Sequence, residues 1–249
     1  MTGKYYMKPV LQKLLADAGI DSRRNCEALI RGGNVRVNGK IAKVGDRADA
    51  SDDVRVRGRR LVLPKGHVYI KLNKPSGYVS TNATFPGEKN VFELVKTSQR
   101  LAIIGRLDKD SEGLLLLTDD GELVNKLTHP KYGVEKVYVV SLAHDLAVTG
   151  KEAKAKAEAL TKAFLEGVDI GQSDGIVRAE RFKHLRGRSF EIVLREGKKR
   201  QIRRMFRRLS CHVAKLTRVR IGLVTIGRLR KGQWLRLTKE EIQKLKDKR

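Results

Sequence analysis

Residues 105–121 read GRLDKDSEGLLLLTDDG. The unbroken apolar run at 114–117 predicts a strand that is buried on both faces, because a strand with one wet face would alternate apolar and polar residues. A loop rich in glycine and charge leads into this strand, and such a loop on a rigid strand is a good mount for a reactive side chain. From the residue types alone, turn capping explains Asp108 and Asp110 better than catalysis does.

The segments around this strand predict more strands and several helices at uneven intervals. Strands are expected at 68–72, 101–104, 136–142, 190–194 and 234–237. Helices are expected at 91–96, 122–127, 151–164 and 201–209, and a last helix begins at Thr238 with a capping box to Glu241. This irregular order indicates an α+β fold with a mixed, largely antiparallel sheet and flanking helices, not a regular βαβ series.

The N-terminal residues predict a separate small α+β unit. Two helices, at 8–18 and from 21 or 22 to 30, precede a hairpin whose turn is Asn38-Gly39, a strong hairpin signal. A strand at 53–57 completes the unit, and the turn-forming residues 63–66 read as a linker. We therefore expect an N-terminal domain at 1–62, a linker at 63–66 and a second domain at 67–249.

The charge of the chain indicates a polyanionic partner. Among 249 residues, 54 are Lys or Arg and 28 are Asp or Glu, which gives a net charge of +26, while 40% hydrophobic residues are enough for a real core. The charge is concentrated at 195–220, where eleven basic residues stand with one acidic residue. Such a concentration costs self-repulsion unless phosphates lie opposite, so nucleic acid is favoured over a solvated surface or a membrane.

Several classes of protein are not expected. No apolar run reaches the roughly 18 residues of a membrane span, and the first residues lack the apolar core of a secretory signal. Cys26 and Cys211 make neither a disulfide framework nor a zinc pair, and the five histidines are scattered. A phosphate-binding Walker loop and a serine-nucleophile motif are also missing. We expect a cytoplasmic protein that is neither a metal enzyme nor a covalent serine enzyme.

The predicted helix at 201–209 places one arginine at an interesting position. Ile202, Met205, Phe206 and Leu209 form an apolar stripe; at about 100° per residue, Arg204 points outward and Arg203 lies on the border of the stripe. Pairing of Arg203 with a carboxylate and exposure of its guanidinium to water are equally compatible with this spacing. The basic residues 198–200 oppose the helix dipole, which favours a bound anion there.

Four motifs in order, with an appended domain, carry a family resemblance. They are GRLDKDSEGLLLLTDDGEL at 105–123, NKPSGYVST at 73–81, KVYVV at 136–140 and EGKKRQIRRM at 196–205. Together they resemble the RNA pseudouridine synthases of the RsuA type, over residues 8–240. The segment SRRNCEALIRGGNVRVNGKIA at 22–42 is similar to an S4 RNA-binding domain. Ser111 stands where many relatives carry Thr, which keeps the hydroxyl.

The resemblance implies roles for individual residues. Asp108 would be the catalytic aspartate, and Arg203 would form an ion pair with it. Tyr138 would stack on the uracil and is a candidate to remove the proton that completes the rearrangement. Arg106 would fill the space that a flipped-out uridine vacates. Enzymes of this family use neither metal nor cofactor.

The implied substrate is a uridine of ribosomal RNA or of a ribosomal subunit precursor, with 23S favoured over 16S and a monomeric enzyme expected. The residues expected to contact RNA are basic: Arg106, Arg23, Arg24, Arg31, Arg36, Lys40, Lys74, Lys198, Lys199, Arg200 and Arg204. Two alternatives are a non-catalytic ribosome-assembly factor on the same fold and a DNA-binding protein. A recognisable groove-reading helix is missing, which weakens the second alternative.

Overall fold

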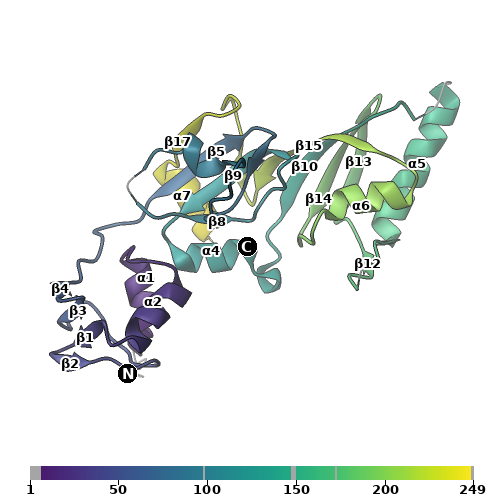
Figure 1. The fold of residues 1–249 in the computed structure, drawn as a ribbon. Helices are drawn as coiled ribbons and strands as arrows, with labels where there is room; N and C mark the ends of the chain where they lie inside the picture. The colour runs from purple at the N-terminus through teal and green to yellow at the C-terminus, as the bar shows by residue number, and fades with distance from the viewer. Residues whose placement is uncertain (1–6, 98, 147–149, 172, 248–249) are drawn as a thin grey trace, which may run out of the picture. The chain divides into compact units, whose positions relative to one another are not determined.

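The computed structural model describes residues 7–97, 99–146, 150–171 and 173–247. The chain divides into two compact units (Figure 1). The first comprises residues 1–68 with the short segments 97–101 and 119–121, and the second comprises the rest. In the described residues, no helix is both long enough and apolar enough to cross a membrane.

The first unit packs two helices on a small sheet. The helices are α1 (Leu11–Asp17) and α2 (Arg23–Arg31), and the sheet has the order β2-β1-β3-β4. Its strands are β1 (Val35–Val37), β2 (Lys40–Ile41), β3 (Val54–Val56) and β4 (Arg59–Arg60). The predicted start signal is confirmed, because the Ser22 hydroxyl accepts the backbone N–H of Asn25.

The predicted Asn38-Gly39 turn is also confirmed in this unit. Both residues have positive φ, 50° and 82°, as a two-residue hairpin turn between β1 and β2 requires. Apolar side chains of the helices and strands form the core of the unit, among them Leu11, Leu15, Ile30, Val35 and Val54.

The second unit is built on one large sheet with the order β13-β14-β10-β15-β9-β5-β17. All neighbours along this path are antiparallel except β15 and β9, which are parallel. The strands are β5 (Tyr69–Lys74), β9 (Glu112–Thr118), β10 (Lys136–Leu142), β13 (Arg181–Arg186), β14 (Ser189–Leu194), β15 (Val213–Ile221) and β17 (Trp234–Arg236). The expected mixed, largely antiparallel sheet is therefore confirmed.

Shorter strands extend or flank this sheet. β8 (Ala102–Ile104) pairs with β9, and β16 (Val224–Thr225) pairs with β15. Two small ladders stand apart: β6 (Tyr78–Val79) with β7 (Lys89–Asn90), and β11 (Val168–Asp169) with β12 (Ile176–Val177). The helices are α3 (Val91–Leu94), α4 (Gly121–Thr128), α5 (Gly150–Glu166), α6 (Gln201–Arg208) and α7 (Lys239–Lys246), with a 3-10 turn at Pro130–Tyr132.

Strand β9 is the centre of the unit, as its sequence predicts. Leu114–Leu117 are all at most 1% exposed. Leu114 and Leu116 join a core that includes Ile104, Leu123 and Ile221. The buried strand thus gives a rigid base to the loop at 105–111 that precedes it.

A second core of aromatic rings lies where α5 and α6 cover β13 and β14 (Figure 1). Phe164 of α5 lies 4.3 Å from Phe182 of β13 and 4.7 Å from Phe206 of α6, measured between ring centroids. Phe190 of β14 completes the group at 5.1 Å from Phe182. These contacts fix α6, and with it the basic residues that begin this helix.

Candidate active site

The loop at 105–111 is held from below by the buried ammonium group of Lys74. This residue ends β5 and is 0% exposed. Its Nζ donates to the carbonyl oxygens of Pro75, Asp108 and Ser111 at 3.1, 3.1 and 2.6 Å. The expected contact of Lys74 with RNA is therefore wrong. Its three donors are used on backbone carbonyls of the chain, and phosphates cannot reach it.

A second buried cation holds both ends of the same segment. Arg218 of β15 is 1% exposed; its Nε donates to the carbonyl of Leu114 at 2.8 Å and its guanidinium also donates to the carbonyl of Gly105 at 2.7 Å. Gly113 allows this close approach, since a Cβ there would lie 2.2 Å from the carbonyl oxygen of Arg218. The loop is thus pinned where it begins and where it enters β9.

Asp110 joins the loop to the start of α6. Its carboxylate accepts two hydrogen bonds from Arg200, at 3.0 and 2.9 Å, and lies 3.2 Å from Nε of Arg203. Burial would raise the pKa of this carboxyl, but the guanidinium groups of Arg200 and Arg203 outweigh it and hold the pKa below its ordinary value. The two arginines thus favour the ionised form of Asp110, although its side chain is 44% exposed.

The sequence left two alternatives for Arg203: an ion pair with a carboxylate, or a guanidinium group in water. The structure has the ion pair, and the partner is Asp110. The expected ion pair with Asp108 is wrong for the chain in this state. The Arg203 guanidinium also donates to the carbonyl oxygens of Asp110 and Val213, at 2.9 and 3.0 Å. These contacts fix the distance between α6 and the loop.

Asp108 stands among these cations without being paired. Within the described part of the chain, no hydrogen bond or ion pair engages its carboxylate, although its own carbonyl is held by Lys74. Burial lowers the pKa of Lys74 to about 8, and the carboxylates of Asp110, Asp108 and Glu112 act in the opposite direction. The Asp108 carboxylate thus lies within electrostatic reach of Lys74 and is only half-buried.

Tyr138 lies in β10 at a position linked to this loop through the sheet. It is 8% exposed, and Arg218 of β15 is its neighbour in register, while Arg218 in turn is opposite Gly113 of β9. Lys136, two residues earlier in β10, lies beside Arg218 at Gly105. Burial, and then the charge of Arg218, lowers the pKa of Lys136 to about 8.

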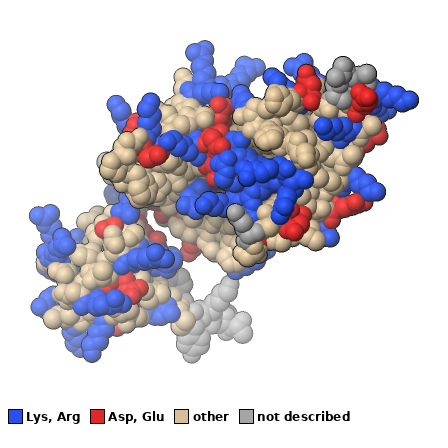
Figure 2. Space-filling model, turned by 45° about the vertical axis from the view of Figure 1, so that its right-hand side comes forward, with Lys and Arg blue, Asp and Glu red and all other residues tan. Residues whose placement is uncertain are grey.

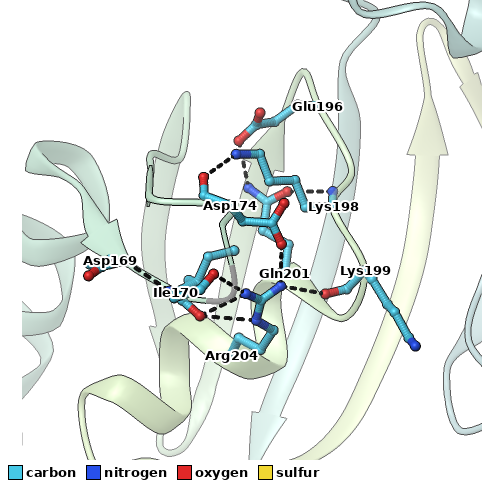
Figure 3. Close-up of polar contacts among 9 residues, drawn as sticks. Asp169, Ile170, Asp174, Glu196, Lys198, Lys199, Gln201 and Arg204 are labelled. Atoms are coloured by element: carbon cyan, nitrogen blue, oxygen red, sulfur yellow. Dashed lines mark hydrogen bonds and ion pairs between the residues drawn. The ribbon is translucent and has the colours of Figure 1, made fainter.

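Two residues expected to contact RNA are instead bound to Ile170, Gly171 and Asp174 (Figure 3). Arg204 pairs with Asp174 at 2.6 Å and donates to the carbonyl oxygens of Ile170 and Gly171. The ammonium group of Lys198 donates to the carbonyl of Asp174. The outward direction expected for Arg204 is therefore wrong, because a neighbouring segment covers that face of the helix.

The other basic residues are open to solvent or nearly so. Figure 2 shows Lys and Arg side chains over both units, with a dense group on the visible face of the second. The exposed residues of the expected set are Arg106, Lys199, Arg23, Arg24, Arg31, Arg36 and Lys40; Arg200 is half-buried in its pair with Asp110. Of these, Arg31 pairs with Glu27 along α2.

The residues that sequence reasoning missed are Asp110 as a partner, Lys136, and Arg218. Arg218 had no readable signal, because the basic residues of β15 hide the fact that it lies on the same buried face as Leu216. Lys136 had none beyond its place in a motif. Chemically, the site offers an unpaired, half-buried carboxylate on a rigid loop beside cations, which suits attack on, or stabilisation of, an electron-poor carbon.

Comparisons with known proteins agree on one family. The RNA pseudouridylate synthase family matches residues 68–208, and the S4 domain matches residues 11–54. A protein of Aquifex aeolicus named as an uncharacterized RNA pseudouridine synthase is 38% identical over 241 residues, 95% of each chain. The ribosomal large subunit pseudouridine synthase B of Bacillus subtilis is 36% identical over 248 residues, again 95% of each chain.

A solved structure extends the likeness to the fold. A crystal structure of a pseudouridylate synthase superposes with a TM-score of 0.68 at 30% identity, covering 95% of this chain and 99% of the other. The dual-specificity RNA pseudouridine synthase RluF of Escherichia coli is 37% identical over 238 residues, which are 93% of this chain and 76% of that protein.

Proposed function

This chain belongs to the RNA pseudouridylate synthase family, and on that premise we propose that it converts a specific uridine of 23S ribosomal RNA to pseudouridine, with Asp108 as the catalytic carboxylate. The protein is an isomerase that carries an N-terminal S4 RNA-binding domain. The observation that carries the assignment to Asp108 is its unpaired carboxylate among paired neighbours.

The chemistry explains why one free carboxylate is needed. The N1–C1′ bond of uridine breaks, the uracil turns, and C5 bonds to C1′; the proton on C5 then leaves while N1 gains one. The Asp108 carboxylate attacks C1′ or stabilises its positive charge, and for either role it has to be ionised and without a competing partner. Arg200 and Arg203 form ion pairs with Asp110, so the Asp108 carboxylate is available to the substrate.

The remaining steps concern the base. A uridine inside a stack or duplex is out of reach of a half-buried carboxylate, so it has to be flipped out at a cost of about a few kcal/mol. We assign Tyr138 to stacking on the uracil and to proton removal at C5, and Arg106 to the space that the base leaves. Arg203 acts on Asp108 through the loop that it fixes at Asp110.

The assignment of regions follows the same logic. We propose an S4 domain at 1–62, a linker at 63–66 and the catalytic domain at 67–249. The S4 arginines Arg23, Arg24, Arg31 and Arg36, with Lys40, are exposed and suited to phosphate contacts. The large subunit is favoured because the Bacillus subtilis relative named for that subunit matches over 95% of both chains.

The test is a map of pseudouridine in both ribosomal RNAs. Unmodified 23S and 16S transcripts are incubated with the purified protein, treated with carbodiimide and read by reverse transcription for resistant adducts. We expect a new adduct at one position of 23S RNA. Adducts in 16S RNA alone would overturn the choice of subunit, and adducts in neither would overturn the choice of ribosomal RNA.

A further inference from the structure

A short loop beside the Asp108 loop presents an aromatic ring to solvent. Residues 82–87, between β6 and β7, are exposed throughout, and Phe85 is 53% exposed. A single exposed Phe is common on protein surfaces and by itself indicates no function. Here, however, the backbone that carries the ring is firmly held, and this sets Phe85 apart from an unconstrained surface residue.

The base of the loop is fixed by a buried amide. The Asn90 side chain is 9% exposed and donates to the carbonyl oxygens of Thr81 and Ala83, at 2.8 and 3.0 Å. The amide oxygen of Asn90 accepts the backbone N–H of Phe92, in the first turn of α3. Within the loop, the N–H of Glu88 donates to the carbonyl of Phe85 at 3.1 Å.

The same loop is tied to the segment that carries Asp108. Glu88 forms an ion pair with Lys109, the residue after Asp108, at 2.9 Å. Just before the loop, the N–H of Gly77 donates to the carbonyl of Lys109 at 2.8 Å, and the Ser80 hydroxyl accepts the N–H of Leu107 at 3.4 Å. The backbone of Phe85 is therefore placed relative to the candidate catalytic carboxylate.

We propose that Phe85 stacks on an unpaired base of the substrate RNA that neighbours the target uridine. Bases splayed from a loop are received on aromatic faces, and cations nearby neutralise the phosphates that accompany them. Lys89, four residues after Phe85 and exposed, supplies such a cation, while Lys109 is engaged with Glu88. The proposal rests on the proposed function, because it takes RNA as the ligand, and it adds a contact outside the reaction itself.

The experiment compares three substitutions of Phe85 in the full chain. Affinity for an unmodified 23S transcript is measured by filter binding at several salt concentrations. We expect Phe85→Ala to bind about 5- to 100-fold more weakly, Phe85→Trp to match the wild type, and Phe85→Leu to resemble Phe85→Ala. The slope of log affinity against log salt should not change, because all three variants keep the cations that meet phosphates.

A matched control is available in Leu235 of β17, which is 54% exposed. Leu235→Ala removes a similar amount of exposed apolar surface and should leave the affinity unchanged. The proposal is overturned if Phe85→Ala binds like the wild type, or if Phe85→Leu does. The first result would leave the ring to a protein partner or to no partner, and the second would show that apolar area suffices without stacking.

Turnover separates this proposal from the proposed function. Release of tritium from uracil C5 of the same transcript is followed for each variant, and we expect Phe85→Ala to raise KM while kcat stays near the wild-type value. If the wild type releases no tritium, the proposed function fails while the affinities still report on Phe85. A fall in kcat at unchanged KM would overturn the stacking role.

Discussion

Asp108 and Asp110 stand two residues apart and have opposite surroundings. The Asp110 carboxylate is engaged by two guanidinium groups, while the Asp108 carboxylate has no partner within the described residues. A carboxylate already neutralised by two arginines is a poor nucleophile, because its lone pairs are used in hydrogen bonds. The division of labour between the two residues is therefore the basis for assigning the chemistry to Asp108.

Replacement of the free carboxylate should remove turnover and spare binding. For Asp108→Asn we expect tritium release to fall on the order of a thousandfold or more, because the amide cannot attack C1′. RNA affinity should stay close to that of the wild type, since the amide has the same size. Asp110→Asn is the comparison, and it should weaken the contact of the loop with α6 and retain measurable turnover. Wild-type turnover by Asp108→Asn would contradict the assignment.

Lys136 gives a prediction about pH. The unfolded chain keeps the proton of this lysine up to about pH 10.5, while the folded chain, in which burial lowers its pKa to about 8, releases it earlier. Between these values the unfolded state binds more protons, so the stability of the wild type rises with pH relative to a variant without the group. The difference between the two pKa values corresponds to a change of about 3 kcal/mol in the free energy of unfolding.

The measurement is urea unfolding of wild type and Lys136→Met between pH 7 and pH 10.5, followed by the fluorescence of Trp234. Across this range, we expect the free energy of unfolding of the wild type to rise relative to that of Lys136→Met. Lys183→Met, at an exposed position of β13, serves as the control and should show no such trend. A constant difference between wild type and Lys136→Met would mean that Lys136 stays charged throughout.

At the scale of elements, the parallel contact between β9 and β15 fixes the end of the loop at 105–111, where the chain enters β9. Gly113 has φ of 104°, and the backbone of Arg218 lies where a side chain would start. Gly113→Ala should therefore force β15 away from β9, with a loss of about 3 kcal/mol or more in stability and with loss of turnover. Both are measured by thermal unfolding and tritium release.

The control for this change is Gly187→Ala. Gly187 also has positive φ, 51°, but no atom lies within 4 Å of the position of a Cβ. Its substitution should cost only the conformational strain, about 1 kcal/mol. Equal effects of the two substitutions would show that the close packing of β9 against β15 does not matter.

The elements also show where sequence reasoning succeeds. The Leu114–Leu117 strand, the Ser22 and Thr238 caps and the Asn38-Gly39 turn follow local rules, and the structure has all of them. Strands β13 and β15 are not predicted, because their many basic residues hide the alternation of buried positions. Each is recognised only when its neighbour in the sheet is known.

The site is less predictable than the elements, and for a physical reason. Lys74, Lys136 and Arg218 are buried cations, although such groups are almost always at the surface. For Lys74 and Arg218 the cost of this burial is offset by backbone carbonyls of the segment 105–114, which lies far from both residues in the sequence, so no local pattern reveals it. The choice of Asp110 over Asp108 as partner of Arg203 depends on how α6 docks, and the aromatic core around Phe206 sets that position.

For the whole molecule, the surplus of positive charge is divided between structural and free groups. Arg204, Lys198 and Arg218 bind other groups of the chain. The net charge of +26 therefore overstates the number of basic groups that are free to contact phosphates. The S4 unit differs in this respect, because Arg23 and Arg24 are exposed at the start of α2. If these two arginines contact the RNA backbone, they have to contribute to the salt dependence of binding.

The double substitution Arg23→Ala with Arg24→Ala tests this in the full chain. Each arginine–phosphate pair that is removed should lower the slope of log affinity against log salt by about 0.7 to 0.9, because fewer counterions are released on binding, so the double substitution should lower it by about 1.4 to 1.8. Lys154→Ala with Lys156→Ala removes the same charge from exposed positions of α5 and is the matched control. Filter binding to 23S transcript across a salt series gives both slopes. If the two double variants shift the slope equally, the S4 arginines act only through net charge, since a direct contact would reduce the slope in the Arg23 and Arg24 variant alone.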